Sequence, residues 1–469
     1  MAEIFNMENE FIYKGYFYLP ENSDNTVFGS LSFVQSSGAL LELAGSLTGV
    51  MNRGVFKPEI ILGETSDGKK LTLYKCLENN RHLSSPGYIS TKFSAIYLFV
   101  GAHFPDSSNI KFSEAYFEFH NLDQWLDISG FKINDSKHQS DKELKIYYEL
   151  PERLYYKLDT NTDFGFSFSH SSFQINTFQK NIQLEQHSNI FFHFKSNCAD
   201  LNTILDLLNA FQNYLALATY GVTYAFSIIL INPDNYFQYD DNIHHEEIKL
   251  FIKRNRIFDD SRTKDKFQML FNFQQVKYDF QKMFLKWLKI RNDLEPAINL
   301  LFDYFYKSRT FTTNHFLNII HAIETYHRRC FNNFVINPET HKKRLDTIYK
   351  NVSEEHLRWL KEKLLFSHEP SLKERLEEII DSVENDVLLK VIGSKDEFIK
   401  AAKNSRNYYV HFSPSLKKKA LVGGQLYHLS EKLKYLLIYC LLKDIGISEN
   451  DISKVFSKNR YELFGHLDN

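Results

Sequence analysis

The sequence predicts a multidomain α+β protein in which a β-rich N-terminal region precedes an all-α helical bundle. Three observations support this prediction. At 469 residues the chain is too long for one hydrophobic core. Its first half contains short strand-like runs separated by turn residues, and beyond about Phe267 apolar residues recur at helical spacing. We expect a β-rich domain over residues 1–195, a mixed α/β connecting region over 196–300 and a helical bundle over 301–469.

The N-terminal region contains apolar and β-branched runs bounded by Gly, Asn, Asp and Ser. The turn Ser66–Gly68 separates Ile60–Gly63 from Lys70–Tyr74, which is a good hairpin signal. Further strand-like runs are Ala95–Val100, Ala115–Phe119, Leu144–Tyr148, Phe164–Phe168 and Ile190–Phe194. Their spacing predicts a sandwich or an open barrel. The 42 Phe and 27 Tyr residues fit strands and cores better than a base-stacking surface.

One uncharged stretch, between Asp206 and Asp234, is long enough to cross a bilayer. It contains several polar residues and divides at Tyr220-Gly221 into a helix-like half and a β-branched half. We therefore expect a buried helix-turn-strand and no membrane partner. The acidic N-terminus does not resemble a signal peptide, and none of the four cysteines forms a CxxC pair. These features predict a cytoplasmic location and argue against a zinc site or a disulfide framework.

The second half of the sequence has the periodicity of amphipathic helices. The expected helices are Phe316–Ile323, Arg375–Leu389, Phe398–Val410 and Leu426–Leu441, the last of which stops near Gly446. Four helices joined by short or medium connections predict a bundle. The net charge is −2, so nucleic acid could be bound only through a local basic patch.

The segment RNYYVH, Arg406–His411, closes one predicted helix and is the strongest candidate for catalysis. The segment resembles the signature of a ribonuclease superfamily, and RNA cleavage without a metal ion needs a base for the 2′-hydroxyl, an acid for the leaving 5′-oxygen and positive charge at the phosphate. Histidine can act as base or acid near neutral pH. Arginine stays charged and offers a planar fork to two phosphate oxygens. Asn407 could hold the phosphate or orient the histidine, and the expected products are a 2′,3′-cyclic phosphate and a 5′-hydroxyl.

This segment resembles the signature of the HEPN superfamily, an arginine followed by a polar residue and, a few positions later, a histidine. Two other pairs, Arg309 with His315 and Arg460 with His466, fit the loose signature but lack the asparagine. Together with FLNIIHAIETYHRR (316–329) and HEPSLKERLEEII (368–380), the segment looks like the HEPN domain of ApeA-type anti-phage proteins. The stretches 61–76 and 98–125 are similar to the β-rich region of that family.

The resemblance implies a metal-independent endoribonuclease without a cofactor, acting in abortive-infection defence, with transfer RNA as the expected substrate class. It assigns catalysis to Arg406, Asn407 and His411, with Glu324 as a supporting acidic residue on an earlier helix. The candidate RNA-binding residues are Lys417, Lys418, Lys419 and Tyr408. The N-terminal region is expected to sense a phage-derived trigger and to keep the ribonuclease inactive before infection.

Helical geometry limits how Arg406 and His411 can cooperate. Residues five apart on a regular helix point about 140° away from each other. Either the helix breaks before His411, which Pro414 favours, or two chains pair their motifs across a cleft. Family likeness favours the second arrangement, so we expect a homodimer or a higher homo-oligomer with a composite site.

Three other interpretations stay open at this point. Arg406 could merely stabilise a helix C-terminus, with His411 an incidental loop residue. The bundle could be a non-catalytic HEPN module that binds nucleotide, RNA or a partner protein. A metal-dependent nuclease could use His321, Glu324 and His327, which recur every three residues. The cluster His244–Glu247 is expected to be a solvated helix start.

Overall fold

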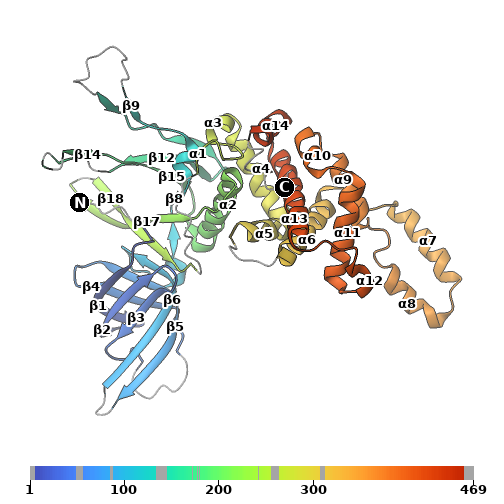
Figure 1. Cartoon of the computed structure of the whole chain (residues 1–469). Helices are drawn as coiled ribbons and strands as arrows, with labels where there is room; N and C mark the ends of the chain where they lie inside the picture. Colours follow the sequence, from blue (N-terminus) through green and yellow to red (C-terminus); the bar gives the residue numbers. More distant parts are fainter. Residues whose placement is uncertain are drawn as a thin grey trace. The chain divides into compact units, whose positions relative to one another are not determined.

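The computed structural model describes residues 6–48, 56–84, 88–133, 145–171, 173–176, 178, 180–240, 242–254, 264–306 and 312–458. The chain splits into two compact units. The N-terminal unit comprises Met1–Leu215, Thr223–Lys266 and Asn272–Gln275, and the helical unit comprises Ala216–Val222, Phe267–Phe271 and Val276–Asn469. The predicted fold class, β-rich and then all-α, is confirmed (Figure 1). The boundaries of the three predicted parts stay a prediction.

Six strands at the start of the chain close a barrel (Figure 1). They are β1 (Phe11–Leu19), β2 (Asn22–Val34), β3 (Gly38–Leu43), β4 (Ile60–Thr65), β5 (Lys70–Ser84) and β6 (Tyr88–Val100). Their order is β6-β3-β2-β1-β4-β5, and β5 returns to pair with β6. Alternate residues such as Phe17, Leu31 and Leu73 point inward and are fully buried. The predicted hairpin at Ser66–Gly68 is present, with Gly68 at φ 80°.

A second set of strands continues the sheet from β6 in the order β18-β17-β8-β15-β12-β11. These strands are β8 (Glu114–Phe119), β11 (Leu154–Lys157), β12 (Thr162–His170), β15 (Gln186–Phe194), β17 (Ala225–Tyr239) and β18 (Asn242–Ile252). One face is aromatic and buried: Phe119 and Phe166 pack against Phe211 of α2 (Leu201–Thr219). The opposite face is polar, as alternation in a one-sided antiparallel sheet requires.

Short elements complete the N-terminal unit. They are η1 (Ser107–Asn109), β7 (Lys111–Phe112), α1 (Leu122–Leu126), β9 (Phe131–Ile133), β10 (Ile146–Tyr148), β13 (Gln174–Asn176), β14 (Asn181–Gln183), β16 (Ala199–Asp200) and α3 (Phe273–Val276), whose last residue belongs to the helical unit. The uncharged stretch is α2 followed by β17, with the turn at Tyr220 in the left-handed region, so the predicted helix-turn-strand is confirmed. Among the helices that the structure describes, none is both long and apolar enough to traverse a membrane.

The prediction of a helix start at His244–Glu247 is wrong, because these residues lie inside β18 and pair with β17. Every second residue beyond them, Ile248 and Leu250, is fully buried. Burial of every second residue is typical of a strand with one buried face. The prediction relied on the charge of the cluster and missed this alternation.

The helical unit is built around α13 (Gly423–Ile445), which packs against α4 (Phe280–Asp293) and α6 (Thr312–Cys330). The remaining helices are α5 (Glu295–Tyr306), α7 (Pro338–Lys350), α8 (Glu354–Leu364), α9 (Leu372–Asp381), α10 (Asp386–Ile392), α11 (Lys395–His411), α12 (Pro414–Lys417) and α14 (Glu449–Lys458). The apolar stripes of α6, α9, α11 and α13 face one another and form the core. As predicted, α13 ends at Gly446, which has φ 104°.

The single helix predicted over Arg375–Leu389 is in fact two helices, α9 and α10. The buried side chain of Asn385 accepts a hydrogen bond from the backbone N–H of Leu388 and so begins a new helix. The apolar spacing continues across this break, which is why periodicity alone predicted one helix.

Candidate active site

The motif Arg406–His411 forms the C-terminal end of α11, which runs without interruption from Lys395 to His411. The helix ends at Phe412, which has φ 49° and donates its backbone N–H to the carbonyl of Tyr408 at 2.6 Å. The helix therefore does not break before His411, and that alternative was wrong. The two side chains leave one regular helix about 140° apart in direction and about 7.5 Å apart along its axis.

Arg406 faces α6 and lies beside Glu324. Its Nη2 atom is 3.4 Å from Oε1 of Glu324, and Nη1 is 3.5 Å from Oδ1 of Asn407. The exposed fractions of the Arg406 and Glu324 side chains are 29% and 21%. The buried Nε–H of Arg406 has no hydrogen-bond partner among the described residues. These contacts are long and leave N–H donors available, so the guanidinium is placed to bind an incoming anion.

His411 lies at the exposed end of α11. Within the part of the chain that the structure describes, its imidazole forms no hydrogen bond or ion pair. Asn407, four residues earlier, lies on the same side of the helix as His411 and also contacts Arg406. The structure thus brings Arg406, Asn407 and Glu324 together and leaves His411 apart, facing solvent.

The two tyrosines of the motif differ in their surroundings. The hydroxyl of Tyr409 donates to the carbonyl of Leu421 at 2.8 Å, and its ring packs on Phe316, which gives it a structural role. Tyr408 is half-buried and packs edge-on against Tyr409 and Phe412. The three lysines predicted to bind RNA, Lys417, Lys418 and Lys419, are all exposed just after α11.

The other arginine–histidine pairs give no second candidate site. Arg309, Arg460 and His466 lie outside the described residues. His315 is half-buried against the ring of Tyr304, with 4.8 Å between the ring centres, and burial lowers its pKa.

A buried polar network behind Glu324 was not predicted from the sequence. His327 is fully buried, with Nε2 at 2.6 Å from Glu378 and Nδ1 at 3.0 Å from Nη1 of Arg375. An arginine can only donate, so Nδ1 accepts and Nε2 donates its proton to Glu378. Arg375 also binds Glu369 at 3.0 Å, and its charge attracts Glu324. Arg375 therefore adds a second positive charge near Glu324, besides that of Arg406.

The sequence contained only a weak signal for this buried network. Arg375 precedes the inward-facing Leu376 and is itself only 3% exposed, although arginine is rarely buried without a partner. Burial lowers the pKa of His327, and the positive charge of Arg375 lowers it further, against the opposing hydrogen bond to Glu378. A sequence pattern could not reveal this pairing, because its members lie on two helices about 50 residues apart.

The three residues of the alternative metal site do not converge. His321 is exposed, Glu324 pairs with Arg406, and His327 uses both ring nitrogens in the buried network. No group of three or more His, Cys, Asp or Glu side chains suited to a metal ion occurs among the described residues.

Comparison with known families gives two matches, which together cover most of the chain. Residues 12–287 match the model described as ApeA N-terminal domain 1. Residues 317–451 match the model described as Apea-like HEPN, a range that includes Glu324, the motif Arg406–His411 and Lys417–Lys419. Neither a curated protein nor a solved structure matches the chain.

Proposed function

The chain belongs to the ApeA-like proteins, in which an ApeA N-terminal domain precedes a HEPN domain, and from this premise we propose that it is a metal-independent endoribonuclease of anti-phage defence. HEPN domains are generally ribonuclease modules. The proposal rests on one observation: a single helix presents a partly exposed Arg406, whose Nη contacts are long, and a solvent-facing His411.

The proposed reaction is an in-line transesterification. A histidine acting as base removes the proton of the 2′-hydroxyl, and the 2′-oxygen forms a bond to phosphorus. The bond from phosphorus to the 5′-oxygen breaks, and an acid returns a proton to that oxygen. Arg406 binds the phosphate oxygens and stabilises the charge that accumulates on them, while Asn407 holds the phosphate or orients His411. The products are a 2′,3′-cyclic phosphate and a 5′-hydroxyl.

We assign the two proton transfers to His411 of two copies of the chain. One unbroken helix cannot aim Arg406 and His411 at one phosphate, so a second copy would complete the site. Apolar side chains around the motif support such pairing: Val410, Phe412 and Val422 are 41%, 64% and 61% exposed. A homodimer would cover these residues and place two motifs across one cleft.

The expected substrate is transfer RNA in the cytoplasm, and cleavage would shut down translation during infection. Lys417, Lys418, Lys419 and Tyr408 would contact RNA beside the motif. The N-terminal unit would sense a phage-derived trigger and restrain the nuclease until then. Family membership and the position of the exposed lysines support these roles.

The test is host toxicity together with sequencing of RNA ends. Overproduced wild-type protein should slow growth and generate 2′,3′-cyclic phosphate ends in transfer RNA. Arg406→Ala and His411→Ala should abolish both effects, with activity reduced about 100-fold or more. Matched controls are Lys400→Ala on the exposed side of α11 and His356→Ala on α8, which should behave as wild type.

Two results would reject the proposal. If toxicity and cleaved ends persist in both site variants, the motif is not the catalytic centre. If the purified wild-type protein binds transfer RNA without cutting it in cells or in vitro, the domain is a binding module. Cleavage should also survive chelation by EDTA, whereas the nuclease built on His321 and Glu324 would lose activity.

A further inference from the structure

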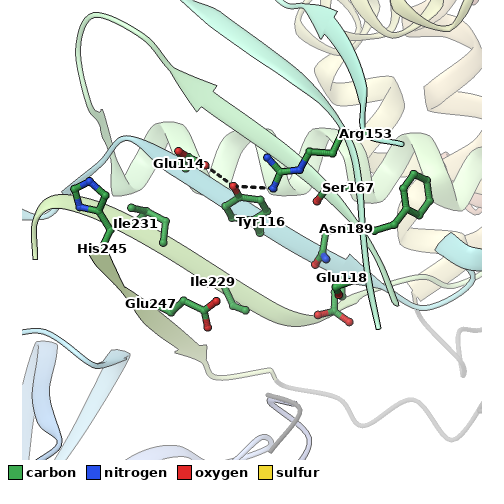
Figure 2. Close-up of a pocket in the computed structure, with 12 residues that line it drawn as sticks. Glu114, Tyr116, Glu118, Arg153, Ser167, Asn189, Ile229, Ile231, His245 and Glu247 are labelled. Atoms are coloured by element: carbon green, nitrogen blue, oxygen red, sulfur yellow. Dashed lines mark hydrogen bonds between the residues drawn. The ribbon is translucent and has the colours of Figure 1, made fainter. Parts of the chain in front are cut away.

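The polar face of the second sheet in the N-terminal unit contains a cavity of about 430 Å³ (Figure 2). It forms because side chains alternate along each strand. On β8, Ala115, Phe117 and Phe119 are buried on one face, so Glu114, Tyr116 and Glu118 point to the other. Neighbouring strands add the rest of the lining, including Ser167, Asn189, Ile229, Ile231 and Glu247. A cavity of this size suits a small molecule.

The lining of the cavity includes three carboxylates and one arginine. One of the carboxylates already offsets the positive charge of the arginine. Arg153 donates from Nη2 to the hydroxyl of Tyr116 at 3.4 Å, and Tyr116 in turn donates to Glu114 (Figure 2). The guanidinium also lies 5.3 Å from the ring centre of Phe191. Glu114 therefore balances Arg153 through Tyr116, and Glu118 and Glu247 remain as acidic groups without an ion pair to lysine or arginine among the described residues.

Glu118 is the more unusual of the two remaining carboxylates, because it is only 8% exposed yet lines the cavity. Among the described residues, no lysine or arginine forms an ion pair with it. Its polar neighbours are the neutral hydroxyl of Ser227 and the imidazole of His187, whose Nδ1 is 3.9 Å away. A buried carboxylate without a strong cationic partner is costly. It is the kind of group that a bound cation would neutralise.

Glu247 lies across the cavity from Glu118, on an exposed part of β18, and has no ion pair within the described residues. The strand order β8-β17-β18 places Ile229 and Ile231 of β17 between the two carboxylates. Figure 2 shows Ile229 between Glu118 and Glu247. The strand registers pair Glu247 with Ile231 and Glu118 with Ser227, so the two acids are separated by two strand spacings and by four residues along the strands, roughly 16 Å between their Cα atoms. The lining thus runs diagonally from acid to apolar to acid over the length of a polyamine.

We propose that this cavity binds an aliphatic polyamine, with one ammonium group at Glu118, another at Glu247 and the methylene chain against Ile229 and Ile231. Ser167 and Asn189 would accept or donate further hydrogen bonds at the rim. Anionic ligands such as nucleotides fit poorly, because two unbalanced carboxylates would repel them. The proposal concerns ligand binding in the N-terminal unit and does not depend on the ribonuclease function.

The experiment is isothermal titration calorimetry of the full chain with spermidine and spermine at low ionic strength. Both should bind at one site per chain, whereas putrescine, which is too short to bridge the two carboxylates, and butylamine, with one ammonium group, should bind more weakly. Glu118→Gln and Glu247→Gln should each weaken binding about 10-fold or more. The matched control is Glu246→Gln, which removes the neighbouring carboxylate on the opposite face of β18 and should bind as wild type.

Three outcomes would contradict the proposed amine site. Equal binding by wild type and by both the Glu118 and Glu247 variants would show that amines bind elsewhere through nonspecific charge. Absence of heat with either amine, or binding of adenosine monophosphate in their place, would overturn the proposed ligand class. Glu247 is exposed, so its replacement leaves the fold intact and keeps the test decisive if Glu118→Gln alters stability.

Discussion

Single residues account for most of the chemistry that can be inferred for this chain. Arg406 is neither fully paired nor fully solvated: its ion pair with Glu324 is 3.4 Å long, and its buried Nε–H has no partner in the described part of the chain. A guanidinium in this state can exchange a weak intramolecular contact for a phosphate without first losing a strong one. In the proposed mechanism Glu324 therefore orients Arg406 and transfers no proton.

We predict that Glu324→Gln lowers cleavage by roughly 10- to 100-fold, less than Arg406→Ala does. The amide keeps a hydrogen-bond acceptor near Arg406 but removes the charge that holds the guanidinium in position. The measurement is the rate of transfer RNA cleavage by purified protein. Equal losses in Glu324→Gln and Arg406→Ala would instead assign Glu324 a direct part in catalysis. Glu378→Gln, at the far side of the His327 network, tests whether loss of another carboxylate on these helices gives the same loss.

A second prediction concerns stability and rests on Glu118. Burial, with a contribution from Asp123, raises the pKa of this carboxyl from 4.5 to about 7, and His187 is the nearest imidazole. Between pH 4.5 and about pH 7 the carboxyl of Glu118 is ionised in the unfolded chain but protonated in the folded chain. The free energy of unfolding therefore falls as pH rises through this window. The shift corresponds to at most roughly 3 kcal/mol.

Replacing Glu118 by Gln should remove this pH-dependent loss. Relative to wild type, the variant should gain about 2–3 kcal/mol in the free energy of unfolding between pH 5 and pH 8. Urea unfolding at several pH values measures this difference. Glu246→Gln should show no such trend, and a variant whose difference from wild type stays constant with pH would contradict the burial of an ionisable Glu118.

At the scale of elements, the end of α11 combines a strained residue with exposed apolar surface. Phe412 adopts a left-handed conformation, φ 49°, that a glycine would adopt more readily, and its side chain is 64% exposed. Its backbone N–H closes the helix end at Tyr408 and its ring touches that of Tyr408, but most of the side chain lies in solvent. The proposed dimer would give this exposed ring a role.

We therefore predict that Phe412→Gly stabilises the folded chain but weakens its dimer. The helix end should gain up to about 1 kcal/mol, because glycine adopts the left-handed conformation without penalty. The proposed dimer should weaken at the same time, and RNA cleavage should fall with it. Analytical ultracentrifugation measures the assembly, with Phe366→Gly as control because Phe366 is 66% exposed away from the motif. A wild-type monomer with full activity would contradict the composite site.

At the scale of the whole molecule, the chain combines a ligand-sized cavity in one unit with a HEPN domain in the other. A freely active ribonuclease would harm its own cell, so we expect the N-terminal unit to restrain the helical unit. A chain beginning at Phe267 should be more toxic than the full chain, and His411→Ala should abolish that toxicity.

This truncation also removes Ala216–Val222, which belong to the helical unit. Tyr220 donates a hydrogen bond to Tyr435 at 2.9 Å, so the shortened chain loses some stability. Circular dichroism should confirm that the helices persist before toxicity is compared. If the folded fragment is no more toxic than the full chain, the restraint does not reside in the N-terminal unit.

The sequence by itself determined the fold class, the strand-like runs of the barrel and the stripes that become α6, α11 and α13. These features are periodic and local, and local periodicity is what a sequence pattern reports. It also determined the motif Arg406–His411, through residue chemistry and family likeness. Two predictions were wrong where local signals conflict. The charged cluster His244–Glu247 lies in a strand, and Asn385 divides one predicted helix into two.

Only the tertiary structure decided which distant residues meet. It placed Glu324 beside Arg406, buried His327 between Arg375 and Glu378, and gathered Glu118, Ile229 and Glu247 around one cavity. It also showed that α11 stays helical to His411, which favours a composite site over a broken helix. The physical reason is that burial and pairing depend on how separate elements pack, and nothing in the spacing of residues along one element specifies its neighbours.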